Sequence, residues 1–182
     1  MELIDQFTTN IYGKILENVD PSLTDKILKF KSTNQSVSKS NEGGWQSEVL
    51  NWDALDWLTP LILQIKQEVE PLFSEYGTTN SGLFKYWVNV NEPTNSNVKH
   101  RHVGSIFSGV MYIKVPENSG NIIFYRENLH IALFYAMTEK NRPVIELTPQ
   151  ENGLLIFPAF LEHEVTPNLS NETRISIAFN IN

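Results

Sequence analysis

The last ten residues, TRISIAFNIN (173–182), have the pattern of a β-strand with two chemically different faces. Side chains alternate between the faces of a strand, so every second residue lies on the same side. One face carries the apolar residues Ile175, Ile177, Phe179 and Ile181. The other face carries Arg174, Ser176, Ala178 and Asn180. We expect the apolar face to pack against helices and the other face to border a space between two sheets.

Short runs rich in β-branched and aromatic residues precede this strand and have the composition of further strands. They are GLFKYWVNV (82–90), SIFSGVMYIKV (105–115), NIIFY (121–125), PVIEL (143–147), GLLIF (153–157) and HEVT (163–166). Seven or eight short strands that follow helices predict a mainly β protein with a jelly-roll core. The fold class is therefore a cupin-like double-stranded β-helix, flanked by α-helices and with a cavity between its sheets.

Helical spacing of apolar residues is found only in the first part of the chain. PSLTDKILKF (21–30) predicts one helix, and an apolar stripe over residues 54–76 predicts a longer one that Gly77 ends. Pro60 would begin or bend this second helix. Residues 31–47, rich in Ser, Asn and Gly, are predicted to form a loop.

The length of 182 residues favours a single domain, 1–182. In this prediction residues 1–80 are a mostly helical N-terminal part that includes the Gly/Ser/Asn-rich loop. Residues 81–182 form the jelly-roll core.

Composition excludes several classes of protein. The net charge of −7, with scattered Lys and Arg, argues against a partner that is duplex nucleic acid. No apolar run approaches the roughly 20 residues that span a bilayer, so we expect no membrane partner. The first residues lack the pattern of a secretion signal, and we expect a cytoplasmic protein, in the host cytoplasm if it is viral. Without cysteine, a metal site must use nitrogen and oxygen ligands.

Three of the four histidines form a candidate metal site. His100 and His102 are two residues apart at a strand or its entry, so their side chains project to one face and can reach one ion. A third ligand is needed, and His163 stands where a strand follows a Pro-containing turn. The fourth, His130, is expected to be a surface residue.

Arg174 and Ser176 form a candidate anion site beside these histidines, because they lie on the same face of the last strand. A buried guanidinium without a partner is costly, so an arginine in a closed cavity favours a carboxylate ligand. Imidazole ligands with open positions and a cavity arginine fit an iron(II) site that binds a keto acid and activates oxygen.

At this point the sequence resembles a known family. It is similar to the 2-oxoglutarate and iron(II)-dependent oxygenases, in particular to a branch common in marine bacteria and phages. The similar segments cover about residues 40–180 and are NEGGWQS (41–47), HRHVGSIFSGVMYIKVPENSG (100–120) and PQENGLLIFPAFLEHEVTPNLSNETRISIAFN (149–180). The resemblance implies an enzyme that uses iron(II), 2-oxoglutarate and dioxygen. It would hydroxylate an unknown substrate and release succinate and carbon dioxide.

The resemblance also implies roles for single residues. His100 begins the metal motif, His163 is the distal ligand, Arg174 binds the far carboxylate of 2-oxoglutarate, and Ser176 assists it. Most members carry Asp or Glu where this chain has His102, so whether His102 binds the metal is left open. Relatives often have Tyr-Tyr in place of Met111 and Tyr112, so one hydroxyl contact to the co-substrate is expected to be absent. Ser108 or Asn89 are the expected replacements.

Several alternatives remain open at this stage. A jelly roll that binds a ligand without redox chemistry would need no reaction at the histidines, and a three-histidine dioxygenase would need no 2-oxoglutarate. Trp45 and Gln46 belong either to a tight loop or to a lid over the cavity. Phe107, Ile156 and Phe157 are expected to form an apolar shell around the metal. The sequence leaves the oligomeric state open, with a homodimer as one arrangement.

Overall fold

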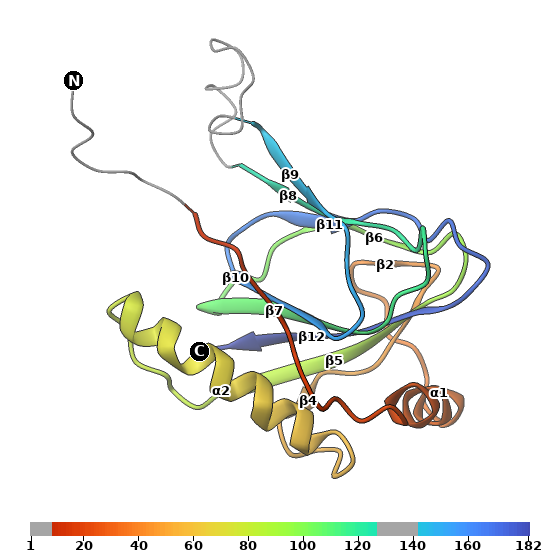
Figure 1. The fold of residues 1–182 in the computed structure, drawn as a ribbon, viewed down its shortest axis with the longest axis horizontal. Coiled ribbons are helices and arrows are strands. Elements are labelled where there is room, and N and C mark those ends of the chain that lie inside the picture. The colour runs from red at the N-terminus through yellow and green to blue at the C-terminus, as the bar shows by residue number, and fades with distance from the viewer. Residues whose placement is uncertain (1–8, 127–141) are drawn as a thin grey trace.

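The computed structural model describes residues 9–126 and 142–182. In these residues the chain forms two helices and two antiparallel sheets that face each other (Figure 1). The larger sheet has the order β1 (Tyr12–Ile15), β10 (Gly153–Pro158), β7 (Phe107–Lys114), β12 (Arg174–Ile181), β5 (Phe84–Asn91) and β3 (Trp45–Gln46). β4 (Leu50–Asn51) also pairs with β5. The smaller sheet has the order β2 (Asn41–Glu42), β6 (Ser96–His100), β11 (His163–Val165), β8 (Ile122–Tyr125) and β9 (Val144–Leu147).

The eight strands β5 to β12 confirm the predicted jelly roll. Four of them (β5, β7, β10, β12) lie in the larger sheet and four (β6, β8, β9, β11) in the smaller one. The chain crosses between the sheets at almost every connection, which closes the double-stranded β-helix.

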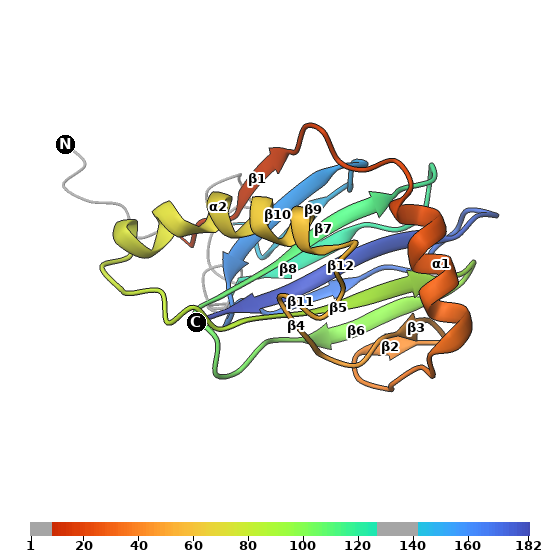
Figure 2. The ribbon, with the colours of Figure 1, turned by 90° about the horizontal axis from the view of Figure 1, so that it is seen from below.

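Both helices cover the outer face of the larger sheet (Figures 1 and 2). These helices are α1 (Leu23–Thr33) and α2 (Thr59–Glu75). The apolar stripe of α2, with Ile62 and Ile65, packs with Ile177 and Phe179 of β12 in the larger of two apolar clusters. The apolar face of the last strand therefore meets the helices, as its alternation predicts.

The ends of α2 have local causes. Pro60 lies in the first turn, where its missing N–H has no helical partner to lose, so it begins the helix and does not bend it. Residues 54–58, predicted to be helical, form turns before it. Gly77 has φ +63° directly after the cap residue Tyr76, a left-handed conformation that favours glycine. None of the helices in residues 9–126 and 142–182 has the length and apolar character needed to cross a membrane.

The NEGGWQS segment joins the two sheets and does not form a lid, because Asn41–Glu42 form β2 of the smaller sheet and Trp45–Gln46 form β3 of the larger one. Its Trp45 packs with Phe30 of α1 at 5.9 Å between ring centroids, on the helix side of the sheet. Gly43 has φ +75°, and a Cβ atom there would come within 2.4 Å of the Asn95 side chain. The glycine therefore allows the turn between β2 and β3 to pass close to the loop that follows β5.

Candidate active site

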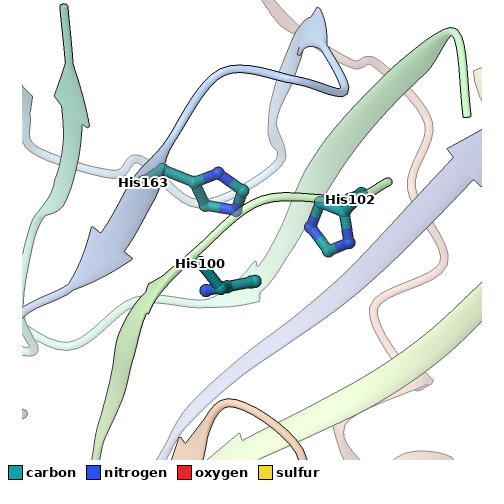
Figure 3. A group of neighbouring side chains, drawn as sticks. All are labelled: His100, His102 and His163. Atoms are coloured by element: carbon teal, nitrogen blue, oxygen red, sulfur yellow. The ribbon is translucent and has the colours of Figure 1, made fainter. Parts of the chain in front are cut away.

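The three predicted histidines come together (Figure 3), and all three line a cavity between the sheets. His100 ends β6 and His163 begins β11, and the two residues are direct cross-strand partners. His102 follows β6 by two residues, and its backbone N–H donates to the carbonyl of Ala159 at 2.9 Å. One candidate ligand atom from each ring lies within 4.8 Å of the other two. Residues separated by about sixty positions in the chain therefore form one cluster.

Two of these rings are oriented by backbone carbonyl groups. Nδ1 of His100 lies 2.7 Å from the carbonyl oxygen of Val98, and Nδ1 of His163 lies 2.9 Å from that of Leu161. A carbonyl only accepts hydrogen bonds, so Nδ1 carries the proton in both rings and Nε2 keeps its lone pair for a ligand. Such contacts fix the orientation of metal-binding histidines in proteins.

Burial keeps all three histidines in the neutral form that binds metal ions. Burial, with a smaller contribution from the neighbouring His100, lowers the pKa of His163 to about 3 and that of His102 to about 4. The pKa of His100 is also lowered by burial, against the effect of its contact with Val98. At neutral pH no proton has to be displaced from these rings before a metal binds.

The donor set fits a divalent metal ion of the first transition series. Imidazole suits iron, zinc, nickel and copper. Ligands at about 2.1 Å from a common ion are at most about 4.2 Å apart, so a span of 4.8 Å closes with small rotations of the rings. His102 is the third member of this cluster, and no carboxylate joins it among the described residues.

The cavity next to the histidines has an apolar wall and a polar wall. Its apolar wall includes Val110, Ile122 and Phe157, and the Phe157 ring lies 4.8 Å from that of His163. The volume open to the centres of water molecules is about 50 Å³, where one water needs about 10–15 Å³. This is room for about three to five water molecules.

The predicted apolar shell was correct for one residue of three. Phe157 lines the cavity, whereas Phe107 and Ile156 pack on the helix side of the larger sheet. The pairing of β10 with β7 explains the difference, because Phe157 faces Ser108 and lies on the opposite side from Ile156.

Arg174 is a buried cation that no described carboxylate pairs with. Its side chain is 2% exposed and lines the cavity, and Nη1 donates to the carbonyl oxygen of Ser119 at 2.6 Å. A Cβ atom on Gly120, which has φ +95°, would lie 2.8 Å from this nitrogen, so glycine is needed beside the guanidinium. Burial lowers the pKa of Arg174, and a carboxylate ligand would remove that unfavourable burial of charge.

The other residues predicted for the co-substrate lie on the same inner face, at different distances from the cavity. Ser176 and Asn89 line the cavity and are cross-strand partners. Ser108 is the second residue of β7, and its hydroxyl donates to Oδ1 of Asn180 at 2.7 Å. Ser108 does not belong to the cavity lining, and a contact with the co-substrate stays a prediction. His130 lies outside the described residues.

Tyr112 is a cavity residue to which the sequence analysis gave no role. It lines the cavity on β7 as the cross-strand partner of Ser176, and burial raises its pKa to about 12 against the effect of Arg174. Met111 packs on the helix side, so a tyrosine at that position would not reach the cavity. Position 111 therefore faces away from the cavity, and the tyrosine that lines the cavity on this strand is Tyr112. The alternation along β7 was a signal for Tyr112, because it shares a face with Val110 and Ser108.

A family model described as "Putative 2OG-Fe(II) oxygenase" matches residues 85–180, more than half of the chain. This match includes the three histidines and Arg174. No curated protein matches the sequence.

Solved structures with the same fold are similar over nearly the whole chain. A prolyl-4-hydroxylase from Pseudomonas putida has a TM-score of 0.71 and 13% identity, over 96% of this chain and 92% of that one. The viral collagen prolyl hydroxylase of Paramecium bursaria Chlorella virus-1, in its 2OG complex, has a TM-score of 0.60 and 12% identity, over 94% of both chains. HygX from Streptomyces hygroscopicus, with nickel and 2-oxoglutarate bound, has a TM-score of 0.61 and 9% identity, over 96% of this chain and 83% of that one. At these identities the likeness concerns the fold.

Proposed function

The chain belongs to the 2OG-Fe(II) oxygenase family, and on that premise we propose that it hydroxylates a second substrate with oxidative decarboxylation of 2-oxoglutarate. In this reaction 2-oxoglutarate, dioxygen and a C–H bond of the substrate give succinate, carbon dioxide and an alcohol. The observation that supports it is the cluster of three neutral histidines in the same cavity as an unpaired buried arginine. Iron(II) and 2-oxoglutarate are the cofactors of the family.

The histidines His100, His102 and His163 would hold the metal. Bound iron(II) supplies the redox chemistry that couples cleavage of the keto acid to oxidation of the substrate. The proposal includes His102 as a ligand because its ring lies 5.0 Å from His100 and 5.2 Å from His163, between ring centroids. A neutral third ligand leaves the centre one charge unit more positive than a carboxylate would, which favours a dianionic co-substrate.

Arg174, Ser176 and Tyr112 would bind the distal carboxylate of 2-oxoglutarate. Arg174 offers a planar set of donors to a carboxylate. The hydroxyl of Tyr112 has no hydrogen-bond partner among the described residues and stays protonated at neutral pH, so it can donate to the same group. These contacts orient the keto acid towards the histidines, and the apolar wall with Val110 and Phe157 excludes water from the reacting atoms.

The first experiment tests the function itself. Under anaerobic conditions, iron(II) and 2-oxoglutarate together should give a visible charge-transfer absorption band that neither gives alone. A jelly roll that only binds ligands would give no band. Oxygen uptake that did not depend on 2-oxoglutarate would instead favour a three-histidine dioxygenase without a keto acid.

The second experiment tests the role of Arg174. In protein with Zn(II) in place of iron, Arg174→Ala should raise the dissociation constant of 2-oxoglutarate roughly 100-fold, because the carboxylate loses its charged partner in a buried site. Ile177→Val is a control on the same strand, because Ile177 packs on the helix side of the sheet. An unchanged constant in Arg174→Ala would remove this residue from the site.

The third experiment tests His102. Anaerobic iron(II) titration of His102→Ala should show an affinity at least about tenfold lower than that of the unaltered protein. The three-ligand centre would be wrong if the affinity stayed the same.

The branch of the family, the cytoplasmic location and the homodimer stay predictions.

A further inference from the structure

A row of four polar side chains crosses the inner face of the larger sheet. Gln46 of β3 pairs with Asn89 of β5, Asn89 pairs with Ser176 of β12, and Ser176 pairs with Tyr112 of β7. Partners across antiparallel strands project to the same face. All four are buried. The row therefore forms a continuous polar strip on the side of the larger sheet that faces the smaller sheet.

The two ends of this row have different neighbours. Tyr112 and Ser176 lie at the end near Arg174, where the proposed function places the distal carboxylate of 2-oxoglutarate. Gln46 and Asn89 lie at the other end, on strands that the smaller sheet covers with β6 and β2. The wall of the cavity on this side includes Asn89, Asn97 and Ser40. All of these groups are neutral.

The carboxamide oxygens of Gln46 and Asn89 have no hydrogen-bond partners among the described residues. Gln46 is 3% exposed and Asn89 is 8% exposed, and the oxygen atoms Oε1 and Oδ1 are both buried without a partner. A buried polar atom without a partner is unfavourable, and native proteins keep few of them. Two on neighbouring residues, one of which lines the cavity, indicate a ligand.

The residues around this pair are paired with each other. Nδ2 of Asn91 donates to Oδ1 of Asn97 at 3.4 Å, and Nδ2 of Asn97 donates to Oγ of Ser40 at 3.3 Å. These side chains are therefore occupied and cannot turn to satisfy Gln46 or Asn89. The oxygen atoms of the two carboxamides have no partner in a region where the other amide side chains form a chain of hydrogen bonds.

The backbone holds Gln46 in place. Its N–H donates to Oγ of Ser36 at 3.1 Å, and its carbonyl accepts from the N–H of Val37 at 2.9 Å. The preceding Trp45 is fixed on the opposite face of the sheet by its packing on α1. Because neighbouring residues of a strand point to opposite faces, Gln46 is directed to the cavity side.

2-Oxoglutarate cannot satisfy the two unpaired oxygen atoms. Its carboxylates and keto group are hydrogen-bond acceptors and offer no donor at neutral pH, whereas Oε1 and Oδ1 need donors. A carboxamide has both an N–H donor and a carbonyl acceptor, so it complements the oxygen and the nitrogen of a second carboxamide.

We propose that Gln46 and Asn89 form a subsite for a carboxamide group of the substrate that is oxidised. This inference rests on the proposed function and deepens it, because it names the chemical class of the second substrate as an amide, such as a peptide. It assigns Asn89 to that substrate, whereas the family resemblance gave Asn89 a contact with 2-oxoglutarate.

Acetamide is the smallest probe of this subsite. With Zn(II) and saturating 2-oxoglutarate bound, saturation-transfer NMR should detect acetamide on the unaltered protein. N,N-dimethylacetamide, which has the carbonyl but no N–H, should bind roughly three- to tenfold more weakly. Gln46→Met, which keeps the length of the side chain, and Asn89→Leu should each reduce acetamide affinity by a similar factor. Ile177→Val should leave it unchanged, because Ile177 packs on the opposite, helix side of the same sheet.

A second measurement does not depend on the folding of any variant. Mn(II) in place of Zn(II) should broaden the methyl signal of acetamide through paramagnetic relaxation, because the subsite shares its cavity with the histidines. Equal affinity for acetamide and N,N-dimethylacetamide, or no broadening, would overturn the subsite and would indicate that the two amides hold only water.

The affinity for 2-oxoglutarate separates this inference from the proposed function. Gln46→Met should leave the dissociation constant of 2-oxoglutarate within about twofold, because the carboxylate site lies at the other end of the row. A rise of tenfold or more would assign Gln46 to the co-substrate and overturn the inference, while the oxygenase function would stand. Loss of 2-oxoglutarate binding by the unaltered protein would instead contradict the proposed function.

Discussion

The two faces of the larger sheet use the same strands for different purposes. On the outer face, Ile177 and Phe179 of β12 pack with α2 in an apolar cluster. On the inner face of the same strand, Arg174 and Ser176 line a cavity. The outer face buries groups that need no partner, whereas the inner face keeps a charge and several polar atoms whose partners are not in the described chain. Stability is therefore concentrated on one face and ligand binding on the other, and a substitution should affect mainly one of them.

The largest expected effect is on the inner side. His163→Ala should lower the affinity for iron(II) by more than about 100-fold, because it removes one of three donors and the ring that Leu161 orients. The measurement is an anaerobic titration, with circular dichroism to verify that the variant is folded. Unchanged metal affinity, or an unfolded metal-free variant, would contradict the assignment of binding to the inner face and stability to the outer face.

The second effect is on the outer face and concerns stability. Ile177 is fully buried in the middle of β12, so Ile177→Ala should lower the free energy of unfolding by about 2–5 kcal/mol. Ile177→Val should cost about 0.5–1.5 kcal/mol. Urea unfolding measures both. Metal and 2-oxoglutarate affinities of the folded variants should stay within about twofold, and a larger change would show that the two faces are coupled.

The sequence was sufficient to predict the outer and inner faces of β12, because strand alternation is a local pattern. The same holds for α1 and α2, whose apolar spacing is strong. It was not sufficient for β1 or β3. β1 is a short edge strand with the sequence YGKI, and β3 has only two residues, so neither contains enough alternation to be recognised. Their conformations depend on pairing with β10 and β5, which lie far away in the chain.

Part of the site could also be predicted from the sequence. His100, His102, His163 and Arg174 have unusual chemistry for their positions, and a resemblance to known motifs connects them. Gln46 and Tyr112 are ordinary residue types, and their roles follow from the cross-strand register of four strands. The assignment of Phe107 and Ile156 to the cavity side failed because a shift of one residue in register moves a side chain to the other face.

The third effect is the dependence of stability on pH. In the unfolded chain His102 and His163 have pKa values of 6.5. In the folded protein their pKa values are about 4 and about 3, respectively. The unfolded state therefore binds more protons below about pH 6.5, and the free energy of unfolding should fall as the pH is lowered from 7 to 5. The slope can reach about 1.4 kcal/mol per pH unit for each histidine.

Urea unfolding of metal-free protein at several pH values measures this slope. The lowered pKa values come mainly from burial on the inner side, so replacing both histidines with phenylalanine should flatten the profile between pH 7 and 5. The carboxyl of Asp20, whose pKa is lowered to about 2 chiefly by its hydrogen bond with Lys26, contributes at lower pH. An unaltered slope in the double variant would place the source of the pH dependence outside the cavity.

The smallest effect tests whether position on the inner face is enough to give a residue a role in binding. Ser108 shares that face with Val110 and Tyr112, but its hydroxyl already donates to Asn180. Ser108→Ala removes this hydrogen bond and should lower the free energy of unfolding by about 1 kcal/mol, with no change in 2-oxoglutarate affinity. Thermal unfolding and a 2-oxoglutarate titration measure the two effects. A weaker titration would mean that Ser108 turns to the co-substrate, and that binding is a property of the whole inner face and not of its unpaired groups alone.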